Sequence, residues 1–123
     1  MKPEKNNNLL IELIKKALDG AHSVGITTHI RPDGDAIGSM LGLGLALSAR
    51  GKQVQMVLPA GVSNSFRNLA GSELIQKKFS AGCDLYISVD CADLKRCGGL
   101  PDNSHYEINI DHHITNEKFA TLN

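Results

Sequence analysis

The sequence predicts an α/β domain in which helices cover a mainly parallel sheet. Short β-branched segments alternate with stretches of helical periodicity, and no tight hairpin turn joins consecutive strand segments. Strands connected through helical stretches form βαβ units, in which the strands run parallel. The length of 123 residues corresponds to one domain that can bury a core without a framework of disulfides.

The composition excludes several classes of protein. The 13 Lys and Arg residues balance the 13 Asp and Glu residues, so the chain lacks the basic excess of a protein that coats nucleic-acid backbone. No run approaches the roughly 20 apolar residues of a membrane span, and the polar start MKPEKNNN does not resemble a secretion signal. Three cysteines without a CxxC pair fit a reducing compartment. We therefore expect a cytoplasmic protein without a membrane partner.

The first predicted elements are an amphipathic helix over residues 7–19 and a buried strand over residues 24–28. Leucine, isoleucine and alanine recur at helical spacing in the first segment, and Asp19 and Gly20 supply a stop. The second segment is short and β-branched, and a cluster of Pro, Gly and Asp follows it. This pattern predicts a strand that runs into a loop.

A second helix is predicted over residues 36–50, with Gly51 placed as at a helix C-terminus. Its glycines, Gly38, Gly42 and Gly44, would each weaken the helix by about 1 kcal/mol relative to alanine. Their presence predicts close packing of this helix on the sheet. A phosphate-binding loop is disfavoured, because the segment lacks the spacing and the lysine of a P-loop.

The remaining predicted elements complete the sheet. Residues 53–58 form a strand that Pro59 ends, and residues 72–79 form a short helix capped by Ser72. Two further strands are expected over residues 86–89 and 107–110.

Acidic and imidazole side chains gather where three of these strands end. The carboxyl ends of parallel strands form the ligand crevice of an open α/β sheet, so these side chains are expected to converge. Like charges at such short range raise one another's pKa values or require cations. The residues concerned are His29, Asp33, Asp35, Asp90, Asp111, His112 and His113.

The donor atoms of this cluster favour a metal centre. Carboxylate oxygens with a minority of imidazole nitrogens suit Mn²⁺ first and then Mg²⁺ or Fe²⁺, whereas the absence of cysteine disfavours a structural zinc site. Four carboxylates exceed what one ion needs. They indicate two ions about 3.5–4 Å apart with a bridging acid, an arrangement that activates water for phosphoester hydrolysis.

Three segments resemble a known family. HIRPDGDAIGS, ISVDCAD and NIDHHITN are similar, in the same order and at similar strand ends, to the first three motifs of the DHH phosphoesterase superfamily, whose domain is Rossmann-like. The IDHHITN-x-x-F ending and the DCADLKR stretch most resemble the bacterial oligoribonucleases that also dephosphorylate 3'-phosphoadenosine 5'-phosphate. Family II pyrophosphatases resemble the chain less, since they usually carry another residue at the position of Gly34.

The resemblance implies a role for each residue of the cluster. One metal would be held by His29, Asp33 and Asp90, and the other by Asp35, Asp90 and His112. His113 is similar to the family histidine that contacts the scissile phosphate, and Asp111 is expected to orient a histidine or hold the backbone turn. Arg96 is a candidate for contact with a substrate phosphate.

Simpler interpretations stand beside these roles. Asp33 and Gly34 after Pro32 form a common turn sequence, and Asp35 could cap the following helix. Arg96 could be a solvated arginine at a helix end. Cys91, Cys97 and Cys83 are interpreted as structural residues, and Cys91 in particular as a small buried hydrophobe rather than a nucleophile.

The resemblance also implies that the sequence lacks parts of the family's full catalytic unit. Members continue with a fourth motif that supplies a metal-ligating aspartate, and with a second domain that grips the substrate. Residues 1–123 are therefore expected to be the N-terminal part of a DHH phosphoesterase domain, truncated at its C-terminus and without the substrate-binding domain. A sheet cut at this point would expose an edge that promotes association into a homo-oligomer.

The expected function is metal-dependent hydrolysis of phosphodiester or phosphomonoester bonds in short RNA or DNA oligonucleotides or nucleotides, such as 3'-phosphoadenosine 5'-phosphate. The isolated segment is expected to be weakly active or inactive. Two alternatives stay open, a non-catalytic module that binds metal or nucleotide and an enzyme like the DHH pyrophosphatases.

Overall fold

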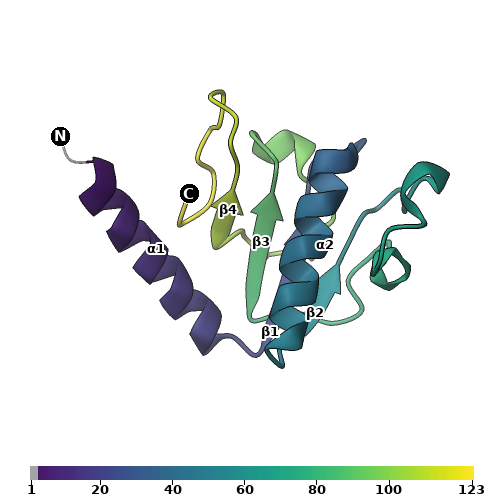
Figure 1. The fold of residues 1–123 in the computed structure, drawn as a ribbon, viewed down its shortest axis with the longest axis horizontal. Helices are drawn as coiled ribbons and strands as arrows, with labels where there is room; N and C mark the ends of the chain where they lie inside the picture. Colours follow the sequence, from purple (N-terminus) through teal and green to yellow (C-terminus); the bar gives the residue numbers. More distant parts are fainter. Residues whose placement is uncertain (1–2) are drawn as a thin grey trace.

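The computed structural model describes residues 3–123 and contains one four-stranded sheet with all strands parallel. The sheet has the order β2-β1-β3-β4, so the strand nearest the N-terminus lies inside it (Figure 1). The helices and strands are α1 (Pro3–Gly20), β1 (Ser23–Thr27), α2 (Gly34–Ala49), β2 (Gln53–Met56), β3 (Leu85–Val89) and β4 (Ile108–Ile110). The α/β fold predicted from the sequence is confirmed.

The two central strands are buried. Val24 and Ile26 of β1 and Ile87 of β3 are completely inaccessible to solvent, and every residue of β3 is buried. Parallel strands covered on their faces are expected to consist of such continuous apolar runs. Ile26 pairs with Ile87, so β1 and β3 share one register in the middle of the core.

Helix α2 packs on the sheet, mainly against β2, and runs from the carboxyl ends of the strands toward their amino ends (Figure 1). Its buried side chains include Ile37, Met40 and Leu47. Close packing holds for Gly44, where an added Cβ would overlap the side chain of Met56. It is wrong for Gly38 and Gly42, because no described atom outside the helix itself lies within 4 Å of a Cβ built at either position.

The segment that follows β2 differs from the prediction. A helix was expected over residues 72–79 with Ser72 as its cap, but only the 3₁₀ turn Ser72–Leu74 forms, and its N-cap is Gly71. Gln76 instead continues the sheet beside β2: its N–H donates to the Met56 carbonyl at 2.8 Å, and its carbonyl accepts from the Leu58 N–H at 2.8 Å. Pairing with the sheet thus replaces a local helical preference.

The outer edge of β4 is also partly paired. The Asn109 N–H donates to the Leu122 carbonyl at 2.9 Å, and the Leu122 N–H donates to the Glu107 carbonyl at 2.8 Å. The edge expected to stay open is therefore covered along this stretch by the end of the described chain. Within residues 3–123, no helix is long and apolar enough to cross a membrane.

The cysteines depart from the sequence-based interpretation in one respect. Cys91 is fully buried, as predicted, but it is bonded to Cys97 in a disulfide that the sequence did not indicate. The 3₁₀ turn Leu94–Arg96 folds the chain back between the two cysteines and brings them together. Cys83 is a free thiol.

Candidate metal centre

The first part of the site is the loop after β1, which carries His29. The Thr28 hydroxyl donates to the Val89 carbonyl at 2.6 Å and so ties the end of β1 to the end of β3. The Ile30 N–H donates to the Arg96 carbonyl at 2.7 Å. These two bonds hold His29 beside the carboxyl end of β3.

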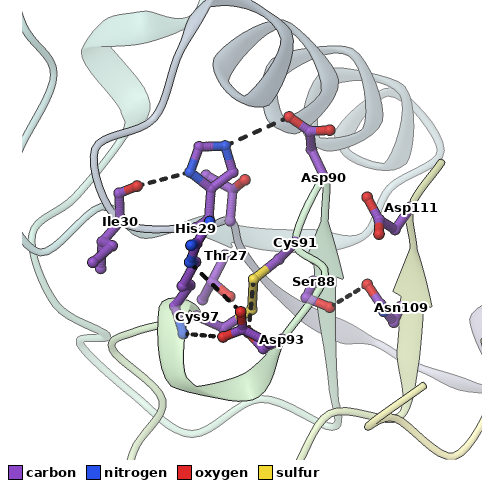
Figure 2. Close-up of a disulfide and its surroundings, with 12 residues drawn as sticks. Thr27, His29, Ile30, Ser88, Asp90, Cys91, Asp93, Cys97, Asn109 and Asp111 are labelled. Carbon is purple, nitrogen blue, oxygen red and sulfur yellow. Dashed lines mark hydrogen bonds and ion pairs between the residues drawn. A yellow bond between two sulfur atoms is a disulfide. The ribbon is translucent and has the colours of Figure 1, made fainter. Parts of the chain in front are cut away.

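The ring of His29 has one nitrogen free to act as a ligand. Its Nδ1 atom lies 2.7 Å from the Ile30 carbonyl oxygen, and a carbonyl can only accept, so Nδ1 carries the proton. Its Nε2 atom lies 3.6 Å from Asp90 Oδ2 (Figure 2). The same atom lies 3.9 Å from Asp33 Oδ1. A metal-ligating histidine is commonly oriented in this way by a backbone carbonyl.

Asp90, directly after β3, is the centre of the site. Its backbone adopts a left-handed conformation with φ of 54°, which aspartate and asparagine tolerate better than most residues. Its N–H donates to the Ile110 carbonyl at 2.9 Å, so β4 supports this turn. The side chain is only 5% exposed.

The two oxygens of Asp90 face different partners. Oδ2 lies toward His29, whereas Oδ1 lies 2.9 Å from His112 Nε2 and 4.0 Å from His113 Nδ1. A carboxylate whose two oxygens face different donors is suited to being shared between two ions.

Asp33 takes part in the site and also begins α2. Its Oδ1 atom accepts the Ala36 N–H at 2.9 Å, which makes Asp33 the N-cap of the helix. The suggestion that Asp35 caps this helix is wrong, since Asp35 lies within the first turn. Ligand atoms of His29, Asp33 and Asp90 all lie within 4.8 Å of one another.

The second part of the site comes from the loop after β4. His112 Nε2 lies 3.2 Å from Asp35 Oδ2 as well as beside Asp90. A second compact group of donors consists of Asp90, Asp111, His112 and His113, again within 4.8 Å. Asp35 is outside that group, although its contact with His112 places it at the same opening. A cavity of about 370 Å³ lies here, lined by Asp35, Ser39, Asp90, Ile110, Asp111 and His112.

His113 and Asp111 form a hydrogen-bonded pair. His113 Nδ1 lies 2.5 Å from Asp111 Oδ1, and Asn116 donates to Asp111 Oδ2 at 2.7 Å. The hydrogen bond to Asp111 raises the pKa of His113, against a smaller opposing effect of burial. Burial alone would raise the pKa of Asp111, but the hydrogen bonds from Asn116 and His113 outweigh it and the pKa is lowered. The pair therefore favours a protonated imidazole beside an ionised carboxylate.

The charges of the site fit a divalent cation. Among the side chains that the structure describes, the carboxylates of Asp33, Asp35, Asp90 and Asp111 form ion pairs with histidines alone, never with lysine or arginine. Oxygen donors with a minority of imidazole nitrogens are the set that Mn²⁺, Mg²⁺ and Fe²⁺ accept. No described cysteine belongs to either donor group.

Arg96 lies beside the site rather than in it. It ends the 3₁₀ turn Leu94–Arg96, is 71% exposed at its side chain and lies 3.5 Å from Asp93 through Nε. A cavity of about 330 Å³ is lined by His29, Ile30, Arg31 and Arg96. The basic wall of this cavity adjoins His29.

Sequence reasoning missed four residues that line these cavities, one of which, Ile30, directly follows His29. Ser39 follows Asp35 by four positions in α2, so helical spacing could have placed both on one face. Arg31 is two residues after His29 and carries a left-handed φ of 50°, which no sequence pattern indicates. Ile110, the last residue of β4, lies just before Asp111 and is 46% exposed at the first cavity.

Comparison with known proteins identifies the fold's relatives. The chain is 40% identical over 116 residues to the bifunctional oligoribonuclease and PAP phosphatase NrnA of Thermus thermophilus. The match covers 92% of this chain and 34% of that protein, so the chain spans about a third of the curated relative. It also superposes on the crystal structure of an exopolyphosphatase-related protein from Bacteroides fragilis with a TM-score of 0.82 and 28% identity, covering 94% of this chain and 38% of that one.

The resemblance to the DHH superfamily, drawn above from three short motifs, is thereby confirmed. Residues 23–123 match the N-terminal domain of the DHH family, and this stretch contains both donor groups of the site. The chain belongs to the DHH family.

Proposed function

We propose that this chain is the metal-binding N-terminal part of a phosphoesterase that hydrolyses short oligonucleotides or nucleotides. The observation that carries the proposal is the placement of Asp90 between two groups of donors, one on each carboxylate oxygen. Membership of the DHH family and the similarity to an oligoribonuclease and PAP phosphatase support the class of substrate. The cytoplasmic location expected from the sequence stays a prediction.

The donors on either side of Asp90, together with Asp35 beside His112, support a set of ligands for two ions. His29, Asp33 and Asp90 would hold one, and Asp90, His112 and Asp35 the other, with Mn²⁺ preferred over Mg²⁺ and Fe²⁺. Two such ions, when bound, supply an activated water and stabilise negative charge on phosphate. Asp90 would fix the position of the two groups relative to each other, because its side chain is buried and its N–H is bonded to the Ile110 carbonyl.

The other residues of the site would act on the substrate. Asp111 holds the proton on Nδ1 of His113, and the raised pKa of His113 favours the cation, which can donate from Nε2 to a phosphate oxygen. Arg96 and Arg31, which line the neighbouring cavity, can pair with a second phosphate of the substrate.

The extent of the chain bears on its activity. We propose that residues 1–123 are the N-terminal part of the DHH phosphoesterase domain and that a separate substrate-binding domain belongs to the whole protein, since the chain spans 34% of its curated relative. Association into a homo-oligomer is supported by apolar side chains on α1, with Leu9 62% and Ile11 52% exposed.

A second candidate is a module that binds metal without turnover. The outer ligands proposed for the second ion favour it for the isolated chain, since His112 is 70% and Asp35 61% exposed at their side chains. An open site of this kind holds water around the substrate rather than excluding it. A pyrophosphatase-like activity is the third candidate.

Two measurements test these candidates. Titration calorimetry with Mn²⁺ should show binding to the chain and its loss in Asp90→Asn, with Asp102→Asn as a control at an acid outside the cluster. Asparagine suits the left-handed backbone at this position, so circular dichroism should show the variant folded. Because the isolated segment is expected to be weakly active or inactive, turnover is then measured on the whole protein that contains this chain, with a dinucleotide, 3'-phosphoadenosine 5'-phosphate and pyrophosphate as substrates.

The results separate the candidates. Mn²⁺-dependent release of mononucleotide or phosphate supports the phosphoesterase, and preference for pyrophosphate supports the third candidate. Binding without turnover supports the module, and equal binding by the wild type and Asp90→Asn would contradict all three.

A further inference from the structure

We propose that Cys91 and Cys97 form a redox-sensitive clasp that sets the position of His29 relative to Asp90. The disulfide joins Cys91, which directly follows Asp90, to Cys97, which forms an isolated antiparallel β-bridge with His29. Figure 2 shows the disulfide below the His29 and Asp90 side chains and close to Asp93, the N-cap of the 3₁₀ turn Leu94–Arg96. Two members of the first donor group therefore lie at the ends of the disulfide: Asp90 precedes Cys91 in the chain, and His29 pairs with Cys97 through the backbone.

The segment between the two cysteines also holds the His29 loop through the backbone. The Asp93 side chain caps the 3₁₀ turn by accepting the Arg96 N–H at 2.9 Å. The Arg96 carbonyl then accepts the Ile30 N–H at 2.7 Å. With the disulfide closed, the turn is held beside Asp90 through Cys91. The His29 loop is held there with it through the bond from Ile30 to Arg96.

Both oxidation states have a place in the fold. Cys91 Sγ lies 3.1 Å from the Asp93 carbonyl oxygen, a contact that a thiol proton turns into a hydrogen bond. The pair is thus not confined to the oxidised form. A chain expected in a reducing compartment would carry two thiols there and close the clasp on exposure to an oxidant.

The chemistry is thiol–disulfide exchange with a small dithiol. Cys97 is half-buried whereas Cys91 is fully buried, so the attacking thiolate forms a mixed disulfide with Cys97. The sulfur–sulfur bond breaks, and Cys91 leaves as a thiolate that takes up a proton. The second thiol of the reagent then displaces Cys97, so that the protein gains two thiols and the reagent becomes a disulfide.

The clasp has a readout that does not depend on metal. Reduction frees the turn, so the Ile30 amide should exchange with solvent about tenfold faster in the reduced chain, because its bond to Arg96 opens more often. Amides in the middle of β3, such as that of Ile87, should exchange equally in both states. The Mn²⁺ affinity, an arm that rests on the proposed function, should fall about fivefold on reduction.

The experiment uses the chain with Cys83→Ser, which removes the free thiol. Samples equilibrated with glutathione disulfide or with dithiothreitol are alkylated and weighed by mass spectrometry, and hydrogen exchange is followed by NMR without metal. Adding Cys97→Ser should give fast Ile30 exchange under both conditions, which identifies the bond as the cause.

The outcomes are distinct. One disulfide per chain with slow Ile30 exchange in the oxidised sample alone supports the clasp. Two alkylated thiols after oxidation, or equal Ile30 exchange in both samples, would overturn it. Unequal exchange together with no Mn²⁺ binding in either state would contradict the proposed function and leave the clasp supported.

Discussion

The Nε2 atom of His112 lies 2.9 Å from Oδ1 of Asp90, although the two residues are 22 positions apart in sequence. Asp90 follows β3 and His112 follows β4, so the parallel pairing of these neighbouring strands creates the contact. The carboxylate is 5% exposed and the imidazole 70% exposed at their side chains. A buried carboxylate is thus contacted by an imidazole that stands at the surface.

His112→Gln should weaken Mn²⁺ binding at least about tenfold, because it removes an imidazole that contacts both Asp90 and Asp35. Titration calorimetry measures the change. His105→Gln is the matched control, since His105 is 78% exposed at its side chain and contacts Glu107 instead of the cluster. Equal losses in the two variants would argue against a ligand at His112.

The pH dependence of stability should carry a contribution from Asp84. The N–H groups of His22 and Ser23 donate to its Oδ2 at 2.9 and 3.2 Å, and these bonds lower its pKa below the ordinary 3.8. A lowered pKa in the folded state stabilises the fold above the unfolded-state pKa, and this contribution is lost as pH falls through the folded-state pKa.

Asp84→Asn keeps an acceptor oxygen and removes the charge. The variant should therefore be less stable than the wild type at neutral pH, and the difference should shrink as pH falls below 3.8. Urea unfolding across this range measures it, with Asp102→Asn as the control. A difference that stays constant with pH would show that the charge is not the cause.

Two glycine substitutions should shift stability in opposite directions. At Gly25 in β1, an alanine Cβ would lie 2.6 Å from Phe79 Cε1 and 2.7 Å from Tyr86 Cδ1, so Gly25→Ala should cost about 1–3 kcal/mol. At Gly42 in α2 the described neighbours leave the position open, so Gly42→Ala should gain about 0.5–1 kcal/mol. Denaturant unfolding of both variants checks the pair, and destabilisation by Gly42→Ala would contradict the open environment.

A buried hydroxyl pair joins β1 to the segment before β4. Thr27 Oγ1 and Tyr106 Oη lie 2.5 Å apart, and Thr27 is fully buried. Thr27→Val and Tyr106→Phe should each cost about 1–2 kcal/mol, because each leaves the other hydroxyl unsatisfied. The double variant should cost less than the sum of the two. Additive losses in urea unfolding would show that the hydroxyls are not coupled.

The parallel sheet could be predicted because the residues of each strand, and those directly after it, are enough to identify it. β1 and β3 are short β-branched or apolar runs with turn residues or acids after them, and such runs remain recognisable without knowledge of their partners. The convergence of Asp90 with His29 and His112 then follows from topology alone, since the three residues end neighbouring parallel strands.

Features set by tertiary contacts could not be predicted in the same way. The segment at residues 72–79 has helical propensity, but Gln76 finds backbone partners beside β2 and stays extended. Asp33 and Asp35 are equally good caps by composition, and Asp33 is the cap because its backbone is extended and the helix begins at Gly34. The disulfide forms because the 3₁₀ turn Leu94–Arg96 brings Cys91 and Cys97 together, and the spacing of the two cysteines does not predict that turn.

Asp33 is both the N-cap of α2 and a proposed metal ligand, so the amide that it caps could report on metal binding. Its Oδ1 atom accepts the Ala36 N–H at 2.9 Å and lies 3.9 Å from Nε2 of His29, a proposed ligand. An ion such as Mg²⁺, which is diamagnetic, would draw electron density from this carboxylate and shift the Ala36 amide resonance without broadening it. Occupancy of the site could thus be followed at the first turn of α2, on an amide that is not itself a ligand.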